Sequence, residues 1–256
     1  MKKIISFSLS GDKPMYTIGA LRNAELAPTV YPGWICRFYV NDTVPPEIIT
    51  RLQELGSEIV FKNEVSNHKS MFWRFDALND PEAEFVIVRD CDSRLNQREA
   101  AAVDEWLKSG ADFHIMRDHP KHASEFMGGL WGCRCSAVTK IDWNKTLDCR
   151  NCYGADQYLL IDLFYRNVYK SAVIHASFWA YEPWAKQFPT ERSHDEYVGE
   201  AFDEHERFDT TERAVLHKKI KLVSKIKLSV RHFLICHGFS VSFMAKWYKK
   251  FTGMDL

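Results

Sequence analysis

The 256-residue chain has no run of about 18 consecutive apolar residues, so the sequence predicts no membrane-spanning helix. It also has no internal repeat and no low-complexity tract. The apolar run near the start is short and is broken by Gly11, Asp12 and Lys13, so we do not expect a secretion signal. Seven cysteines, an odd number, then indicate a reducing cytoplasm and mostly free thiols.

Charge is balanced over the chain as a whole but not along it. Lys and Arg number 34, as do Asp and Glu, yet residues 214–252 hold nine basic residues and no acid, which leaves residues 1–213 with a net charge of −8. Since 46% of the residues are hydrophobic, the chain can bury a sizeable core. We expect one domain over residues 1–213, a basic tail over residues 214–256, and no nucleic-acid partner.

The basic tail is expected to form an amphipathic helix. Apolar residues recur in it at helical spacing: Leu216, Ile220, Val223, Val230 and Leu234. With the Trp247-Tyr248 pair further on, such a helix favours the surface of an anionic membrane. A helix packed on the acidic body is the alternative, and charge alone does not separate the two. The predicted location is cytoplasmic, with peripheral attachment to the inner membrane face in the first case.

Strand-like and helix-like segments alternate along the rest of the chain. Strands are expected at residues 4–9, 34–40, 58–61, 85–88, 112–117 and 172–175, and helices at residues 16–25, 46–55, 70–78 and 99–108. This βαβ alternation predicts a Rossmann-like α/β fold, a mostly parallel sheet flanked by helices. In such sheets ligands bind beyond the carboxyl ends of the strands.

The end of the strand at residues 85–88 is the most informative segment. Its apolar residues lead directly into Arg89-Asp90-Cys91-Asp92. Because side chains alternate along an extended chain, Asp90 and Asp92 point the same way and can bind one hard divalent cation. Arg89, and Arg94 beyond it, fit a site that also holds an anionic phosphate. A polar loop with a solvated Asp-Arg pair is the alternative.

Three later groups are also candidates for the site. Gly128 and Gly129 interrupt an apolar segment, which indicates close approach of a ligand to the backbone or, alternatively, a bulge. Asp156 and Gln157 begin an apolar helical run, where Asp156 can also act simply as a helix cap. His175 ends a strand and is a candidate nitrogen ligand for the metal, with a structural role as the alternative.

The order of these parts resembles the GT-A glycosyltransferases, most closely the family 8 type. Members of that family pair a D-x-D with a later Asp-Gln and a C-terminal metal-binding His. The similarity covers roughly residues 4–200 in order and spacing rather than in close identity. It implies that Asp90 and Asp92 hold Mn²⁺ or Mg²⁺ on the diphosphate of a nucleotide sugar, with a UDP-sugar favoured. His175 comes earlier than the family's histidine, so His194 is the alternative candidate for the third metal ligand.

The resemblance, together with the chemistry of sugar transfer, gives a full set of expected site residues. The donor is expected to contact Ser8, Arg74, Asp76, Arg89, Asp90, Gly128 and Gly129. The expected metal ligands are Asp90, Asp92 and His175. Arg74 and Arg89 would stabilise the leaving diphosphate. Asp156, with Gln157 beside it, would orient or deprotonate the acceptor hydroxyl.

The sequence therefore predicts a metal-dependent hexosyltransferase that moves a sugar to a glycan or lipid-linked acceptor in cell-surface polysaccharide synthesis. Another metal-dependent phosphate enzyme, a phosphatase or a nuclease, is an alternative, although the best-known phosphatase D-x-D follows the first strand. That strand here ends in Ser8-Leu9-Ser10. A non-catalytic module that binds a nucleotide sugar is the third possible function.

Two close cysteine pairs can form a structural zinc site or simply pack in the core: Cys133, Cys135, Cys149 and Cys152.

Overall fold

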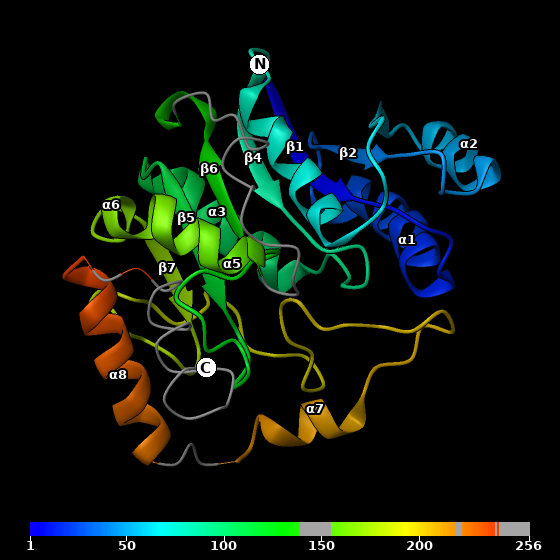
Figure 1. Cartoon of the computed structure of the whole chain (residues 1–256). Coiled ribbons are helices and arrows are strands. Elements are labelled where there is room, and N and C mark those ends of the chain that lie inside the picture. The colour runs from blue at the N-terminus through cyan, green and yellow to red at the C-terminus, as the bar shows by residue number, and fades with distance from the viewer. Residues whose placement is uncertain (139–154, 219–221, 239, 241–256) are drawn as a thin grey trace.

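A computed structural model describes residues 1–138, 155–218, 222–238 and 240 of the chain. Within these residues the strands are β1 (Lys2–Ser8), β2 (Ile35–Val40), β3 (Glu58–Phe61), β4 (Ala83–Val88), β5 (Phe113–Arg117), β6 (Trp131–Arg134) and β7 (Val173–Ala176). They form one seven-stranded sheet in the order β3-β2-β1-β4-β6-β5-β7 (Figure 1).

The described helices lie mostly between the strands. In chain order they are α1 (Pro14–Val30), α2 (Pro46–Glu54), η1 (His68–Asn79), α3 (Gln97–Ser109), η2 (Cys135–Ala137), α5 (Ala155–Leu160), η3 (Ile161–Tyr165), α6 (Arg166–Val168), α7 (Thr210–Val215) and α8 (Leu222–Cys236). The helix expected at residues 70–78 is present as η1, but it is a tighter 3-10 helix. Asn67 caps it by accepting a hydrogen bond from the backbone N–H of Lys69 at 2.7 Å.

The sheet is mostly parallel, as predicted. β1 pairs in parallel with β2 and β4, β2 with β3, and β5 with β7. Among the described strands only β6 runs antiparallel to its neighbours, β4 and β5. Parallel pairing brings the carboxyl ends of β1 and β4 to one edge, where a ligand site is expected.

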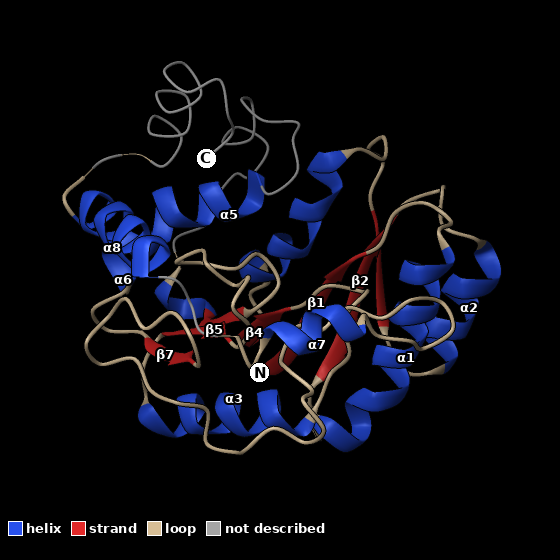
Figure 2. Ribbon diagram, turned by 90° about the horizontal axis from the view of Figure 1, so that it is seen from below, coloured by secondary structure: helices blue, strands red, loops and turns tan. Residues whose placement is uncertain are grey.

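Both faces of the sheet are covered, which explains why the central strands are apolar without alternation. In β1, Ile5 and Phe7 pack in one apolar cluster with residues of α1, α2 and α3. Ile4, which precedes Ile5 and points to the opposite face, packs in a second cluster with η1, α5 and η3. Figure 2 shows the sheet between these two layers of helices.

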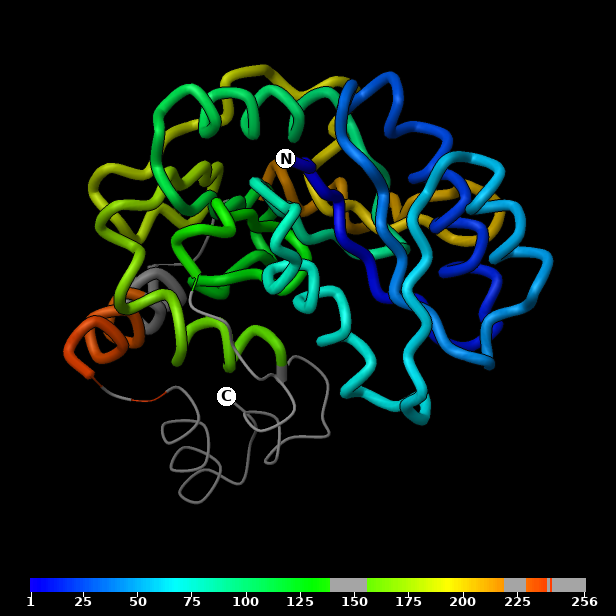
Figure 3. The backbone as a smooth tube through the Cα atoms, turned by 90° about the horizontal axis from the view of Figure 1, so that it is seen from above, coloured from blue at the N-terminus to red at the C-terminus, as the bar shows by residue number. Residues whose placement is uncertain are grey.

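A segment with little regular structure, residues 177–209, runs across the edge of the sheet where β1 and β4 end, and we call it the strap. It is yellow to gold in Figures 1 and 3. A bridge between Ser93 and Ala201 joins the strap to the loop after β4. The backbone N–H of Phe202 donates to the carbonyl of Asp92 at 2.8 Å. The strap therefore supports the loop that carries the D-x-D.

The described part of the basic tail packs on the body. Leu216 and Ile235 are buried, and Nη2 of Arg231 lies 3.0 Å from the carboxylate of the buried Glu125. This packing agrees with the alternative predicted for the tail. Trp247, by contrast, lies outside the described residues. Across the described parts of the chain, no helix combines the length and apolar character needed to cross a membrane.

The predicted zinc site is only partly within the described residues. Cys133 of β6 and Cys135 of η2 are buried with free thiols. Cys149 and Cys152 lie outside the described residues. Zinc binding by the four cysteines therefore stays a prediction.

Candidate active site

A cavity of about 480 Å³ opens at the carboxyl ends of β1 and β4. Its walls come from the loop after β1, the start of η1, the loop after β4, the Gly-Gly segment before β6 and the start of α5. The lining residues are Ser8, Leu9, Ser10, Lys13, Tyr16, Asn67, His68, Ser70, Met71, Arg74, Asp90, Cys91, Asp92, His122, Met127, Gly128, Gly129, Leu130, Asp156, Gln157 and Gly199. The position agrees with the rule for parallel sheets.

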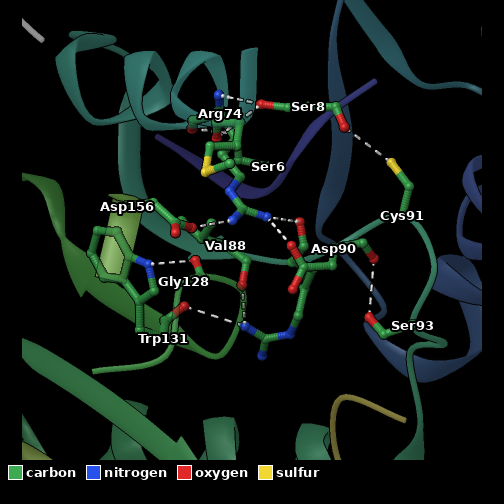
Figure 4. A network of polar contacts seen from close by, with 12 residues as sticks. Ser6, Ser8, Arg74, Val88, Asp90, Cys91, Ser93, Gly128, Trp131 and Asp156 are labelled. Atoms are coloured by element: carbon green, nitrogen blue, oxygen red, sulfur yellow. Dashed lines mark hydrogen bonds and ion pairs between the residues drawn. The ribbon is translucent and has the colours of Figure 1, made fainter. Parts of the chain in front are cut away.

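Arg74 lies at the centre of this cavity wall. Two serines of β1 fix its backbone: the hydroxyl of Ser6 donates to the Arg74 carbonyl at 2.6 Å, and the Ser8 hydroxyl accepts from the Arg74 N–H at 2.9 Å. The guanidinium donates to the carboxylates of Asp90 and Asp156, the latter at 2.9 Å (Figure 4). Arg74 thus joins the D-x-D to the Asp-Gln motif.

The charge of Arg74 is retained despite its burial, since its side chain is only 5% exposed. Burial lowers the pKa of the guanidinium, but the carboxylates of Asp90 and Asp156 outweigh it and leave the pKa raised. Its Nε is buried with no hydrogen-bond partner among the described residues. The cavity wall therefore contains a fixed cation, which suits a phosphate oxygen.

Asp90 and Asp92 both line the cavity, as their alternation predicts. The Asp90 side chain is 47% exposed even though it is paired with Arg74. Burial, together with the charge of Asp90, raises the pKa of Asp92 to about 6. Two carboxylates that repel each other and supply hard oxygen ligands suit a divalent cation. Within the described residues no group of three or more His, Cys, Asp and Glu is arranged to hold a metal.

Gly128 and Gly129 are needed because two carboxylates approach them. A Cβ on Gly128 would overlap Oδ2 of Asp156, and a Cβ on Gly129 would overlap Oδ2 of Asp90. The predicted approach of a ligand to these glycines stays a prediction, and the structure shows that two carboxylates of the protein itself lie against them. The two glycines let the backbone before β6 pass directly beside both acidic groups.

Asp156 and Gln157 begin α5 and line the cavity. One oxygen of Asp156 accepts from the Gln157 N–H at 2.9 Å, and the other accepts from Arg74. Burial raises the pKa of Asp156, although Arg74 opposes the change. Asp156 therefore contacts both the start of the helix and the cavity, so a role as helix cap and a role in the site are compatible.

Arg89 is not in the cavity, which corrects the prediction that it binds the donor. It is fully buried on the other face of the sheet, where Nε lies 3.2 Å from Glu99. Its Nη1 donates to the carbonyls of Val88 and Trp131 at 2.8 and 3.2 Å. The same alternation that directs Asp90 into the cavity directs Arg89 away from it.

His175 does not reach the D-x-D either, so the structure does not support it as a metal ligand. It is fully buried on β7 at the edge of the sheet. Its Nδ1 lies 2.8 Å from His114 and its Nε2 lies 3.4 Å from Glu105, so both ring nitrogens have partners. His194, the rival, is exposed on the strap and does not line the cavity.

Asp76 and Arg94 also lie outside the cavity lining. Asp76 pairs with Lys62 at 2.7 Å at the side of η1, which corrects its assignment to the donor site. Arg94 lies behind the D-x-D loop and pairs with Glu206 at 2.8 Å. The basic residues beside the D-x-D were thus predicted to bind phosphate, but the structure uses them to support the loop and the sheet.

The structure adds His122 to the site, a residue that the sequence did not single out. Its Nδ1 accepts from the backbone N–H of Asp118 at 3.1 Å. Burial, with neighbouring His119, lowers the pKa of His122 to about 3, so the ring is neutral and Nε2 carries the proton. His122 thus offers the cavity a hydrogen-bond donor. The signal was present, since His122 follows the carboxyl end of β5, a strand parallel to β4.

Comparison with known proteins gives no match to any protein-family model and no match to a curated protein. Among solved structures the chain is similar to glucosyl-3-phosphoglycerate synthase from Mycobacterium tuberculosis in complex with Mn²⁺, uridine-diphosphate-glucose and glycerol 3-phosphate. The two are 13% identical with a TM-score of 0.46, over 67% of this chain and 68% of that chain.

A second similar structure is a glycosyltransferase involved in the glycosylation of the major capsid of PBCV-1. It is 14% identical with a TM-score of 0.47, over 72% of this chain and 84% of that chain. Both scores mark only a partial overlap of the backbones. Neither structure tests the resemblance to the family 8 type, which stays a prediction.

Proposed function

We propose that the chain is a divalent-metal-dependent glycosyltransferase that takes a sugar from a nucleoside-diphosphate sugar, with a UDP-sugar favoured. The observation that supports this most is the convergence of Asp90, Asp92, Asp156 and Arg74 on one cavity at the carboxyl ends of β1 and β4. A cavity of this size suits a small ligand rather than a macromolecule. Three acids around one cation also suit a substrate that brings its own metal-bound phosphates.

Asp90 and Asp92 would hold Mn²⁺ or Mg²⁺, which would neutralise charge on the departing diphosphate. Arg74, which lines the same cavity, would give these oxygens a second positive group. Gly128 and Gly129 would let the sugar lie against the backbone between the two acidic groups.

Asp156 would act on the acceptor. Its raised pKa makes it a better proton acceptor than an ordinary aspartate, so it can orient or deprotonate a hydroxyl group. Gln157 and neutral His122 would offer hydrogen bonds to sugar hydroxyls from the same wall. The proposed reaction is transfer of a hexose to a glycan or lipid-linked acceptor, in cell-surface polysaccharide synthesis.

The proposal also covers the domain organisation of the chain and its location in the cell. We assign the transferase to residues 1–213 and a separate attachment role to residues 214–256, in the cytoplasm at the inner face of a membrane. The outer face of α8 supports attachment, because Val230 and Phe233 are 54% and 57% exposed on it. Ile235, on a different side of the helix, is buried against the body.

The proposed function is tested by thermal unfolding with a panel of nucleotides and nucleotide sugars, each with Mn²⁺ or with EDTA. Mn²⁺ and the correct donor together should raise the Tm of the wild-type protein, and Asp92→Asn should abolish the increase. Asp76→Asn is the matched control, since Asp76 is an acid of η1 that does not line the cavity. It should retain the full increase.

A catalytic readout separates the transferase from its alternatives. Slow release of the nucleoside diphosphate from the stabilising donor, dependent on Mn²⁺ and Asp156, identifies a transferase acting on water. Donor binding without release would identify a binding module. Release of phosphate from a simple phosphomonoester, or cleavage of DNA, with no response to nucleotide sugars would identify a phosphatase or nuclease and overturn the proposal.

A further inference from the structure

The loop that carries the D-x-D, residues 90–93, is fixed through its own backbone carbonyls. The Asp90 carbonyl accepts from the Ser93 hydroxyl at 3.0 Å. The Asp92 carbonyl accepts from the N–H of Phe202 in the strap at 2.8 Å. The Ser93 carbonyl accepts from the side-chain amide of Asn23 in α1 at 2.9 Å. We call residues 90–93 the metal loop.

Arg94 is the largest of these supports. Its Nη1 lies 3.3, 3.2 and 3.0 Å from the carbonyl oxygens of Cys91, Asp92 and Ser93. The opposite side of the same guanidinium donates to Glu206 through Nε at 3.3 Å and Nη2 at 2.8 Å. The Arg94 side chain is only 6% exposed, so its contacts with the metal loop are made away from water, whereas Glu206 is 38% exposed.

Close packing leaves this arrangement little freedom. A Cβ on Gly19 of α1 would overlap the carbonyl oxygen of Cys91 and come within 2.8 Å of Nη1 of Arg94. On the other side the guanidinium lies 5.2 Å from the centre of the Phe202 ring. The metal loop and Arg94 are therefore enclosed between α1 and the strap.

We propose that Arg94 is a positioning residue for the metal loop, which it holds in the cation-binding conformation before the cation arrives. Three carbonyl oxygens that converge on one point repel one another, and a guanidinium placed there removes the repulsion. The planar fork also reaches Glu206, which anchors the loop to the strap and balances the charge of Arg94 near the proposed cation. Lysine offers a single point of charge and cannot make both sets of contacts.

This inference rests on the proposed metal site, and Mn²⁺ affinity tests it directly. Free Mn²⁺ is titrated by electron paramagnetic resonance into wild-type protein, Arg94→Lys, Glu206→Gln and Arg22→Ala, each with saturating UDP. Arg22 is the matched control, because it lies 3.9 Å from the same Glu206 but at a half-exposed position on the surface of α1. Unfolding in EDTA measures the stability of every variant separately.

Arg94→Lys should weaken Mn²⁺ binding about tenfold or more, because loss of a group that orients metal ligands costs 10–100-fold in affinity. Glu206→Gln should give a smaller loss, and Arg22→Ala should stay within about twofold of wild type. A purely structural Arg94 would lower the Tm in EDTA and leave the Mn²⁺ affinity of the folded protein unchanged.

The outcomes distinguish the two proposals. Wild-type protein that binds no Mn²⁺ with UDP overturns the proposed function. Wild-type protein that binds Mn²⁺ while Arg94→Lys binds it equally well overturns the role of Arg94 alone. If Arg94→Lys does not fold, Glu206→Gln decides, and wild-type affinity in that variant also overturns the positioning role.

Discussion

Gly129 faces Asp90 so closely that an added Cβ would overlap the carboxylate, while neighbouring Gly128 faces Asp156 in the same way. The two positions therefore allow each acidic group to be displaced without removing it. We expect Gly129→Ala to weaken Mn²⁺ binding about tenfold or more, because Asp90 must move. Gly128→Ala should affect Mn²⁺ binding much less and should lower sugar transfer. Titration of Mn²⁺ and turnover of the donor, measured on both variants, check this.

Each glycine variant is the control for the other, since both add one methyl group to the same segment. Equal loss of Mn²⁺ affinity in both would mean that the segment moves as a unit. Unchanged affinity in Gly129→Ala would show that Asp90 does not bind the metal. Unfolding in EDTA should give similar Tm values for the two variants, because neither methyl group enters the apolar core.

Asp92 predicts a dependence of stability on pH. Burial and the charge of Asp90 raise its pKa from 3.8 to about 6 in the folded protein. Between these values the folded state binds more protons than the unfolded chain, so this contribution to stability falls as the pH rises. In EDTA, Asp92→Asn should therefore gain stability relative to wild type between pH 4 and pH 7.5, by about 1–3 kcal/mol. Urea unfolding at both pH values measures the change.

Mn²⁺ with UDP should stabilise the wild-type protein more at high pH than at low pH, which is opposite to the trend in EDTA. A carboxylate must lose its proton to bind a metal, so the increase in Tm on adding Mn²⁺ and UDP should grow as the pH rises through about 6. Asp92→Asn should show no such growth. A wild-type increase that is the same at pH 5 and pH 7.5 would contradict the assignment of Asp92 to the metal.

The strand-end rule predicted where the acidic residues of the cavity lie. Asp90 and Asp92 needed only a buried strand and its period of two. Gly128, Gly129 and Asp156 followed from the order of motifs, and all three line the cavity with Arg74. The mostly parallel sheet was predicted from alternation of strand and helix, because the helix of a βαβ unit returns the chain so that its two strands run parallel.

Residues whose roles depend on distant partners were not predictable in this way. Arg89 meets Glu99 beneath the sheet and His175 meets His114 at its edge, and no local pattern shows either contact. Arg94 depends on Glu206, which is 112 positions away in the sequence. Sequence patterns identified polar residues near the site, whereas tertiary packing decided which of them face the cavity.

Asp156 is expected to serve transfer more than donor binding. Asp156→Asn keeps the size of the side chain but removes the charge near the acceptor hydroxyl and part of the pairing with Arg74. Turnover should fall strongly while the Tm increase given by donor and Mn²⁺ is preserved, since an interaction made only in the transition state is lost. Asp76→Asn, which changes an acid outside the cavity, should keep both the turnover and the Tm increase of the wild-type protein. Equal loss of turnover and donor binding in Asp156→Asn would show instead that Asp156 binds the donor.

Arg231 couples α8 to the body of the protein. Its Nη2 lies 3.0 Å from Glu125, whose side chain is fully buried and whose oxygens accept no hydrogen bond from a described residue. Arg231→Met should destabilise the protein by roughly 3 kcal/mol, because it removes the ion-pair partner of a buried carboxylate. Glu125→Gln in the Arg231→Met background should restore most of the loss. Urea unfolding of the two single variants and the double variant measures the coupling, and additive effects would show that the pair does not interact.

The outer face of α8 is expected to bind an anionic membrane while the inner face stays docked. Val230 and Phe233 are one helical turn apart and more than half exposed, whereas Ile235 is buried. Shallow insertion of the two apolar side chains would add to the attraction between anionic lipid and the nine basic residues of the segment at positions 214–252. Sedimentation with anionic vesicles should capture the intact chain at low salt and release it as salt rises, because salt screens the charges. The double variant Val230→Ser with Phe233→Ser should bind more weakly at every salt concentration and keep the wild-type Tm, because both side chains are exposed. An intact chain that stays in the supernatant at low salt would eliminate the membrane role and leave α8 as a packing element only.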